Sequence, residues 1–339
     1  MQYSAAQSGS IRFMTPGLVT TIIPVYNRPA QLREAVASVL AQDYPAMEII
    51  VVDDGSTDGA TQEVARALAA ASLGIVRPVV QANAGPGAAR EHGRQLAQGE
   101  FIQYLDSDDL LLPGKFTAQV AALRAHPEAD VAYGITYMRD ASGHLIEAPH
   151  KDTGKAVATM FPSFLNSRWW ETATPLYRAS VCAKAGPWTT LSLEEDWEYD
   201  CRIASLGGKL VWCPVPVSEH RDHGGDRLSR GAALDPRRQR QRATAHGLIF
   251  QHALAFGLTP AHPEMQTFSR SLFLLARQCG AAGLPAESRQ LFKLARQAAG
   301  DNRGRGTDFR LYALAAGVLG WAKAGKASVW LDSIKKTND

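Results

Sequence analysis

Residues 104–109, Tyr104-Leu105-Asp106-Ser107-Asp108-Asp109, place two aspartates one residue apart directly after an apolar run. The run from Glu100 to Leu105 predicts a buried strand, so these carboxylates fall at its carboxyl end. Carboxylate oxygens are the donors with which proteins hold Mg²⁺ or Mn²⁺ on a diphosphate. An isolated Asp-x-Asp pair is more often a cap, here for the helix expected from about Pro113. The other motifs of the chain make a metal site the favoured interpretation here.

The first half of the chain alternates between apolar runs and helical periodicity. Strands are predicted from Leu18 to Val25, Met47 to Asp53 and Ile75 to Gln81. Helical spacing follows the first two runs, and a further helix is expected from Ala88 to Gln98. This alternation predicts a doubly wound α/β sheet, in which ligands bind at the carboxyl ends of the strands.

The second half of the chain has a different character. Between Asp130 and Trp212 the pattern loosens into short strands, turns and an aromatic-rich stretch, where substrate specificity usually lies. After Arg230 the periodicity is helical, with a helix pair around the turn at Gly283-Leu284-Pro285 and a last helix near Asp308 to Lys326. One face of that helix holds Leu311, Leu314, Ala315, Val318 and Ala322, and we expect it to pack into the core rather than to contact a membrane. We therefore expect a flexible leader over 1–17, a catalytic domain over 18–230 and a basic α-helical extension over 231–339.

Charge divides the chain at the same place. Residues 231–339 contain 16 Lys/Arg and 7 Asp/Glu, a net charge of +9, whereas residues 1–230 carry −6. A basic extension is typical of a solvated helical face or of a surface that contacts an anionic partner such as a phospholipid membrane. We expect no nucleic-acid partner, and the extension is also compatible with a homodimer.

No segment of the sequence predicts export or a membrane span. Apolar stretches are interrupted well short of the roughly 20 residues that a spanning helix needs, and the polar N-terminus lacks the pattern of a secretion signal. The four cysteines have neither disulfide nor zinc spacing, so we expect buried thiols in a reducing compartment. These features predict a cytoplasmic protein that can also lie on the inner face of the plasma membrane.

Further polar residues fall where their chemistry suits transfer from an activated sugar. Asp54 ends the second predicted strand, where a carboxylate can bind a nucleobase or ribose, and Tyr26 could lie flat along the base. A transfer with inversion needs a carboxylate to take the acceptor's proton, and Asp196 is the candidate. His223 could complete a metal shell or touch the diphosphate, with His220 as the weaker choice. Each residue also has a structural alternative. Asp54 could belong to a turn, Tyr26 could pack in the core, and Asp196 could lie in the first turn of a helix. The histidines could be unliganded.

These motifs together resemble the family 2 inverting glycosyltransferases of the GT-A fold over approximately Leu18 to Arg230. The resemblance rests on blocks in a fixed order: Thr21 to Arg28, Ile49 to Asp58, Asn83 to Arg90, Gly99 to Asp109, Glu195 to Glu198, and Arg221 to Gly225. It implies a mostly parallel sheet with helices on both faces, followed here by the helical extension. One departure is Glu91-His92, where the family often has asparagine after the arginine, so the role of Arg90 stays open.

The resemblance also implies roles for particular residues. Pro24, Tyr26 and Asp54 would contact the nucleoside, with Arg90 in the same donor site, and Asp106 would bind the ribose or phosphate. Asp108 would bind the Mn²⁺ or Mg²⁺ ion together with His223, and Asp196 would be the base. The expected donor is a nucleotide-diphosphate sugar, with UDP as the nucleotide, and the acceptor is a hydroxyl of a glycan or glycolipid in cell-surface polysaccharide or related synthesis.

Three other functions fit less of the sequence. A nucleotidyltransferase should have a Gly-rich basic loop after the first strand, where this chain has Tyr26-Asn27-Arg28-Pro29. A dinucleotide dehydrogenase should have a complete glycine fingerprint, but Gly85-Pro86-Gly87 follows the third strand and lacks the last glycine. The alternative from another class is a catalytically silent module whose basic tail docks to a membrane or partner, and the presence of every acidic position opposes it.

Overall fold

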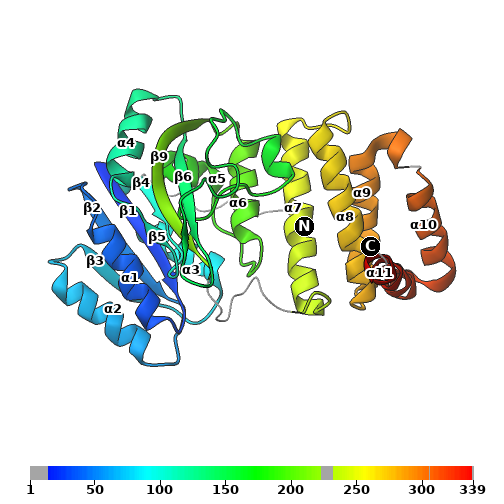
Figure 1. The fold of residues 1–339 in the computed structure, drawn as a ribbon, viewed down its shortest axis with the longest axis horizontal. Coiled ribbons are helices and arrows are strands. Elements are labelled where there is room, and N and C mark those ends of the chain that lie inside the picture. The colour runs from blue at the N-terminus through cyan, green and yellow to red at the C-terminus, as the bar shows by residue number, and fades with distance from the viewer. Residues whose placement is uncertain (1–13, 223–231, 305, 338–339) are drawn as a thin grey trace, which may run out of the picture.

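The computed structural model describes residues 14–222, 232–304 and 306–337. A twisted sheet with helices on both faces forms one end of the molecule, and a row of helices forms the other (Figure 1). The strands are β1 (Thr15–Val25), β2 (Met47–Asp53), β3 (Val76–Val80), β4 (Gly99–Tyr104), β5 (Leu110–Leu111), β6 (Val131–Arg139), β7 (Leu145–Ile146), β8 (Leu176–Arg178) and β9 (Leu210–Arg221). The helices before the extension are α1 (Pro29–Leu40), α2 (Ala60–Ala71), α3 (Pro86–Leu96), α4 (Lys115–Ala125), the 3₁₀ turn η1 (Ser163–Leu165), α5 (Ala179–Ala185) and α6 (Glu195–Ser205).

The first half of the sheet is the parallel unit that the apolar runs predict. Its strand order is β3-β2-β1-β4, and each neighbouring pair is parallel. Burial on both faces explains why β1, β2 and β4 are mainly apolar rather than alternating. The register pairs Val25 with Asp53, so the polar residues that follow β1 and β2 emerge at one edge.

The second half of the sheet is mixed. The order continues through β8, β6, β9 and β5, where β8 runs antiparallel to both β4 and β6, and β6 and β9 run parallel. This half contains the irregular segment that the sequence indicates after Asp130. The mixed α/β architecture with a mostly parallel sheet confirms the predicted fold class.

Hydrophobic residues fill both faces of the sheet. One cluster joins α1 and α4 to the sheet, and its members include Leu32, Val36, Val39, Phe116 and Val120. The other cluster runs from the opposite face through α6 into the helical extension, and its members include Tyr104, Tyr133, Trp170, Tyr199, Ile249, Phe268 and Leu272. The sheet, α6 and the extension therefore share one core. The four cysteines are buried within the protein.

The extension contains α7 (Pro236–Phe256), α8 (Pro263–Ala281), α9 (Pro285–Arg303), α10 (Thr307–Leu319) and α11 (Trp321–Thr337). In Figure 1, α7 to α10 stand in succession away from the sheet, and α10 lies farthest from it. The predicted pair corresponds to α8 and α9, which meet at Gly283 with φ of 80°. None of the helices that the structure describes has the length and hydropathy that crossing a bilayer requires.

The prediction for the last helix is wrong in two respects. The segment breaks at Gly320, where φ is 82°, so two helices replace one. The face expected in the core is outward: Leu311, Leu314 and Val318 are 62%, 66% and 75% exposed. The buried face instead holds Phe309, Tyr312 and Ala316. The aromatic rings bury more area than the leucines, which explains why the helix turns that face inward.

Candidate active site

Asp54 organises the loop that follows β3. Its carboxylate accepts hydrogen bonds from the backbone nitrogens of Ala84, at 2.9 Å, and Gly85, at 2.8 Å, and from Nε2 of Gln81 at 2.8 Å. The neighbouring Gly55 has φ of 74°, and a Cβ there would lie 2.8 Å from the backbone nitrogen of Asn83. The end of β2 and residues 81–85 therefore form one closely packed rim.

Pro24 and Tyr26 lie at the carboxyl end of β1. Pro24 is buried opposite Val52, whereas Tyr26 is 44% exposed at the edge of the sheet. The next residue, Asn27, accepts hydrogen bonds from the backbone nitrogens of Thr57, at 2.8 Å, and Asp58, at 3.2 Å. These bonds tie the loop after β2 to the end of β1. An exposed ring beside an ordered loop can serve as a flat contact for a base.

Arg90, on α3, links two parts of the chain that are far apart in sequence. Its guanidinium lies 2.6 Å from Oδ1 of Asp106 and 2.7 Å from Oε1 of Glu195. The Arg90 side chain is 4% exposed, and the Glu195 side chain is 8% exposed. Buried charges of this kind are tolerated only when they are paired. Arg90 thus joins the loop after β4 to the start of α6.

The segment before α6 packs against the start of α3. The Arg90 guanidinium lies 5.0 Å from the centre of the Trp188 ring, within cation–π range. A Cβ on Gly87 would lie 2.1 Å from the carbonyl oxygen of Thr189, so only glycine permits this approach. The Gly85-Pro86-Gly87 motif therefore has a packing role in addition to turning the chain into α3.

Asp196 is held by a second arginine from the irregular segment. Its Oδ2 accepts a hydrogen bond from Nη1 of Arg168 at 2.8 Å, and the Thr172 hydroxyl lies at 3.5 Å. Burial opposes ionisation, but the charges of Arg168 and Arg90 outweigh it and hold the pKa of Asp196 below its ordinary value. The carboxylate is nonetheless 29% exposed. An ionised carboxylate that solvent and ligands can reach is suited to accept a proton.

Arg168 is itself fixed from the opposite side by Asp200. Its Nε donates to Oδ2 of Asp200 at 2.7 Å, and the same carboxylate accepts from Trp170 at 2.8 Å and from the Tyr177 hydroxyl at 2.6 Å. The Asp200 side chain is 1% exposed. Asp200 therefore stabilises the arginine that orients Asp196 and has no surface of its own for a substrate.

Glu195 and Asp196 are adjacent in sequence but have opposite electrostatic environments. Burial and the charge of Asp196 raise the pKa of Glu195 to about 7, although Arg90 opposes the shift. A raised pKa means that the folded state binds this proton more tightly than the unfolded chain. The contribution of Glu195 to stability is therefore complete below about pH 4.5 and is lost as the pH rises to about 7.

We expect Glu195→Gln to flatten the pH dependence of stability. Between pH 4.5 and pH 7.5 the wild type should lose stability as Glu195 releases its proton, and the variant should be spared roughly 2–3 kcal/mol of this loss in the free energy of unfolding. Denaturant unfolding at several pH values measures this difference. The exposed Glu63, replaced by Gln, is the matched control and should follow the wild-type curve. Parallel curves for wild type and Glu195→Gln would show that Glu195 titrates normally.

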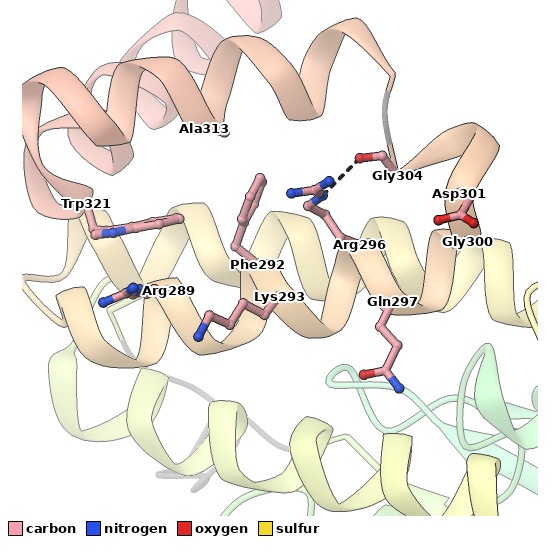
Figure 2. Close-up of a pocket in the computed structure, with 10 residues that line it drawn as sticks. All are labelled: Arg289, Phe292, Lys293, Arg296, Gln297, Gly300, Asp301, Gly304, Ala313 and Trp321. Atoms are coloured by element: carbon pink, nitrogen blue, oxygen red, sulfur yellow. Dashed lines mark hydrogen bonds between the residues drawn. The ribbon is translucent and has the colours of Figure 1, made fainter.

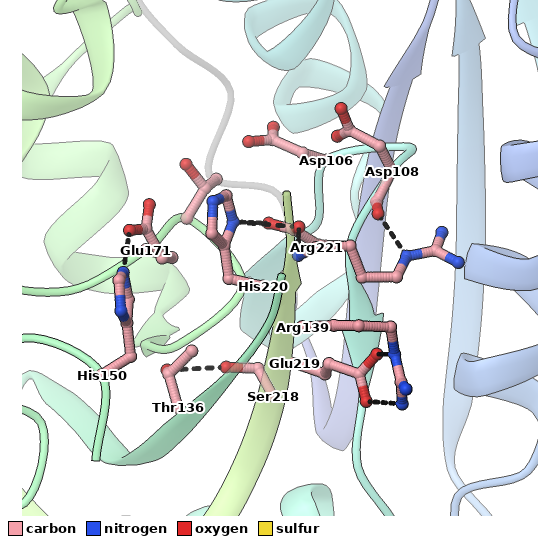
Figure 3. A network of polar contacts seen from close by, with 12 residues as sticks. Asp106, Asp108, Thr136, Arg139, His150, Glu171, Ser218, Glu219, His220 and Arg221 are labelled. Carbon is pink, nitrogen blue, oxygen red and sulfur yellow. Dashed lines mark hydrogen bonds and ion pairs between the residues drawn. The ribbon is translucent and has the colours of Figure 1, made fainter. Parts of the chain in front are cut away.

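Asp106 and Asp108 lie side by side on the loop after β4 (Figure 3). The Asp106 side chain is 33% exposed, and Asp108 forms an ion pair with the Arg28 guanidinium. Arg221 donates from Nε to the carbonyl oxygen of Asp108 at 2.6 Å, which fixes the loop from β9. The Asp106 and Asp108 side chains offer carboxylate oxygens, the ligands that Mg²⁺ and Mn²⁺ prefer, and Asp108 already pairs with the positive charge of Arg28. The two side chains therefore fit either ion. Within the described residues, no three His, Cys, Asp or Glu side chains form a ready-made metal site.

The next acid along the chain, Asp109, is held by residues of β9. Its carboxylate accepts from the backbone nitrogen of Arg221 at 3.0 Å and lies 3.1 Å from Nδ1 of His220. Burial raises the pKa of Asp109 to about 6. The His220 ring stacks on His150, with 5.7 Å between the ring centres. His220 is therefore engaged structurally, and the metal-ligand prediction for His223 lies outside the described residues.

The irregular segment also brings a polar group opposite the aspartate loop. Glu171 lies 3.0 Å from Nε2 of His150 and 2.6 Å from Nζ of Lys151. Despite burial, these two groups lower the pKa of Glu171. Figure 3 shows Glu171 and His150 on one side and Asp106 and Asp108 on the other. The sequence offered no motif for this group, because its members come from a segment without regular periodicity.

The helical extension reaches the start of α6. Glu194, with a φ of 60°, lies two residues before Asp196 and pairs with Nε of Arg242 at 2.9 Å and Nδ1 of His246 at 3.0 Å. Both partners lie on α7. His246 is 4% exposed and stacks on Phe268 of α8 with 5.6 Å between the ring centres. The extension therefore helps to set the backbone that carries Asp196.

Comparison with known proteins adds a family match. Residues 20–180 match the family model described as glycosyl transferase family 2. An uncharacterized glycosyltransferase of Rickettsia conorii is 40% identical over 130 residues, which are 38% of this chain and 21% of that protein. One of Haemophilus influenzae is 36% identical over 107 residues, 32% of this chain and 42% of its own. The matched segment thus spans less than half the length of these relatives.

Solved structures resemble most of the chain. Residues 1–349 of TarS of S. aureus, in complex with UDP-GlcNAc, align with a TM-score of 0.64 at 19% identity, over 93% of this chain and 92% of that one. A mannosyltransferase of Pyrobaculum calidifontis, in complex with GDP-Man and Mn²⁺, aligns with a TM-score of 0.54 at 20% identity, over 93% and 86%. At these identities the likeness establishes the fold, and it includes the helical extension.

Proposed function

Because residues 20–180 match the model of glycosyl transferase family 2, we propose that this enzyme moves a sugar from a nucleotide-diphosphate donor to an acceptor hydroxyl with inversion at the anomeric carbon. The observation that carries the proposal is the Arg90 bridge, with 2.6 Å to Asp106 and 2.7 Å to Glu195. The bridge joins the acidic loop proposed for the diphosphate to the residue beside the proposed base. One cleft then serves both the leaving group and the acceptor.

Asp196 is the proposed general base. As the acceptor oxygen attacks the anomeric carbon, Asp196 takes the hydroxyl proton, and the bond from that carbon to the diphosphate breaks. Arg168 supports this role in two ways: it keeps the pKa of Asp196 low and it fixes the carboxylate through a 2.8 Å hydrogen bond. Such a base is ionised across the neutral range and needs no prior deprotonation.

The donor side is assigned to the strand ends. Pro24, Tyr26 and Asp54 form the proposed nucleoside edge, and Asp106 with Arg90 the proposed ribose and phosphate edge. Asp108, with Asp106 beside it, would hold Mg²⁺ or Mn²⁺, and His223 remains a further candidate ligand. A bound cation would stabilise the negative charge that grows on the leaving diphosphate. Arg28, which now neutralises Asp108, would move aside or share the carboxylate with the cation.

A UDP-sugar is the proposed donor, and a glycan or glycolipid hydroxyl is the proposed acceptor. The likeness to structures that contain UDP-GlcNAc and GDP-Man supports a nucleotide-diphosphate sugar as donor, and the higher TM-score of the UDP-GlcNAc complex, 0.64 against 0.54, supports UDP as its nucleotide. The basic extension, with a net charge of +9, supports peripheral contact with an anionic membrane, where lipid-linked acceptors are found. A homodimer through the same extension is the competing proposal for that surface.

The function is tested by donor hydrolysis with a panel of nucleotide sugars, with and without Mn²⁺. We expect metal-dependent hydrolysis of a UDP-sugar by the wild type, and Asp108→Ala should reduce that rate by on the order of 10²-fold because the cation loses a ligand. Arg28→Gln is the matched control: it breaks the same ion pair but keeps the carboxylate, so its metal dependence should persist.

Two results would contradict this assignment. Hydrolysis of no donor under any metal condition would reject the proposed reaction. Unchanged metal dependence in Asp108→Ala would remove Asp108 from the ligands while leaving the reaction intact.

A further inference from the structure

The outward face of α10 is an apolar surface without a partner in the described structure. Leu311, Leu314 and Val318 recur at helical spacing and are 62%, 66% and 75% exposed, and Leu319 beside them is 50% exposed. The opposite face of the helix is already used, since Phe309 stacks on Phe273 with 4.6 Å between the ring centres. The helix therefore already buries its aromatic face in the core, and the aliphatic stripe remains exposed.

Basic side chains flank this stripe. Arg310 precedes it, Lys323 and Lys326 follow it on α11, and all three are exposed. The sequence from Leu311 to Gly320 contains no charged residue. An exposed aliphatic stripe with basic side chains beside it suits contact with an anionic membrane, because such binding combines burial of apolar area with attraction to anionic lipids.

A groove of about 430 Å³ lies beside the same helix, between α9, α10 and α11 (Figure 2). Ala313, on the side of α10 that packs toward α9 and the core, lines it. The side chains that define its character are Arg289, Lys293, Arg296, Phe292, Trp321 and Asp301. Arg296 donates from Nε to the carbonyl oxygen of Gly304 at 3.1 Å, while the described residues offer no ion-pair partner to Arg289 or Lys293. Three cations against one acid suit a phosphate group.

We propose that this end of the extension docks on an anionic phospholipid bilayer. The α10 stripe enters the interface between headgroups and acyl chains, and the groove along α9 takes a lipid phosphate. The proposal deepens the membrane contact stated above and rests on that part of the proposed function. It identifies the docking surface as α10 and the groove, rather than the extension as a whole.

The observations favour a membrane over a second copy of the chain. A stable protein interface involves about 20–30 residues on each side, and the stripe on one helix offers four large apolar side chains. A second copy would also place two extensions, each with a net charge of +9, against one another. Neither argument applies to an anionic bilayer, which attracts the basic extension and does not require a large protein interface.

The test is cosedimentation of the full chain with vesicles of phosphatidylcholine alone or mixed with phosphatidylglycerol. We expect binding to the mixed vesicles only. The variant Leu311→Gln/Leu314→Gln/Val318→Gln should lose on the order of tenfold or more of that binding, because its apolar face is gone. Arg289→Gln/Lys293→Gln should weaken binding to the mixed vesicles at low salt more than at high salt. The matched control, Leu73→Gln/Leu206→Gln, removes side chains that are 98% and 52% exposed far from α10 and should bind as the wild type.

Donor hydrolysis without vesicles is measured on the same samples. Equal binding by wild type and the α10 variant, or no binding by the wild type, would overturn the docking proposal while normal hydrolysis left the proposed reaction in place. Sedimentation velocity gives a third result: a wild-type dimer that the α10 variant converts to a monomer would assign the face to a second copy instead.

Discussion

Asp196→Asn is expected to lower the rate of sugar transfer by on the order of 10²-fold or more while donor binding stays unchanged. The amide keeps the shape of the side chain and can still accept the 2.8 Å hydrogen bond from Arg168, but it cannot take a proton. The loss should therefore appear in kcat and not in the donor affinity. Steady-state kinetics of transfer together with calorimetric titration of the donor separate the two quantities.

Asp200→Asn is the matched control for this prediction. Asp200 lies on the same helix and contacts the same arginine at 2.7 Å, but its side chain is 1% exposed and cannot meet an acceptor. We expect it to lower stability while the folded enzyme retains most of its transfer rate. If Asp200→Asn and Asp196→Asn were equally inactive when folded, the effect would come from Arg168 and not from a base at Asp196.

Arg90→Met is expected to reduce the free energy of unfolding by about 3–5 kcal/mol, since it leaves the buried Glu195 without its partner. Glu195 escapes part of this cost by binding a proton, so the loss should be larger at pH 8 than at pH 6. Denaturant unfolding at both pH values measures it. Adding Glu195→Gln to the variant should restore part of the stability, because the uncompensated charge is removed.

Arg94→Met gives the comparison within the same helix. Arg94 pairs with Glu91 on α3, where the two side chains are 20% and 13% exposed, so its loss should cost only about 1 kcal/mol. Similar losses at the two positions would mean that the deeper burial of the Arg90 pair adds nothing to its contribution. A stable Arg90→Met variant would also remove the bridge on which the shared cleft depends.

Local sequence patterns were sufficient for the catalytic half of the fold. Strands β1, β2 and β4 are buried on both faces, so their residues form mainly apolar runs that the sequence reveals locally. Polar residues directly after such runs must emerge at one edge of a parallel sheet, which is why the positions of Tyr26, Asp54 and Asp106 could be predicted. The sequence pattern did not predict which face of α10 is buried. Periodicity identifies apolar faces, but α10 has two, an aliphatic one and an aromatic one, and periodicity does not decide between them.

What the sequence determined by itself is therefore the order of the elements and the edge at which the acids collect. Only the tertiary structure decided which groups meet there: Arg90 with Glu195, Arg168 with Asp196, and Arg242 and His246 with Glu194. Arg168 and Asp196 are 28 residues apart, and Arg90 and Glu195 are 105 residues apart. No motif or regular spacing along the chain predicts such pairs. The physical reason is that a helix or strand follows from neighbouring residues, whereas the pairing of a buried charge depends on which side chains the completed core brings within hydrogen-bond reach.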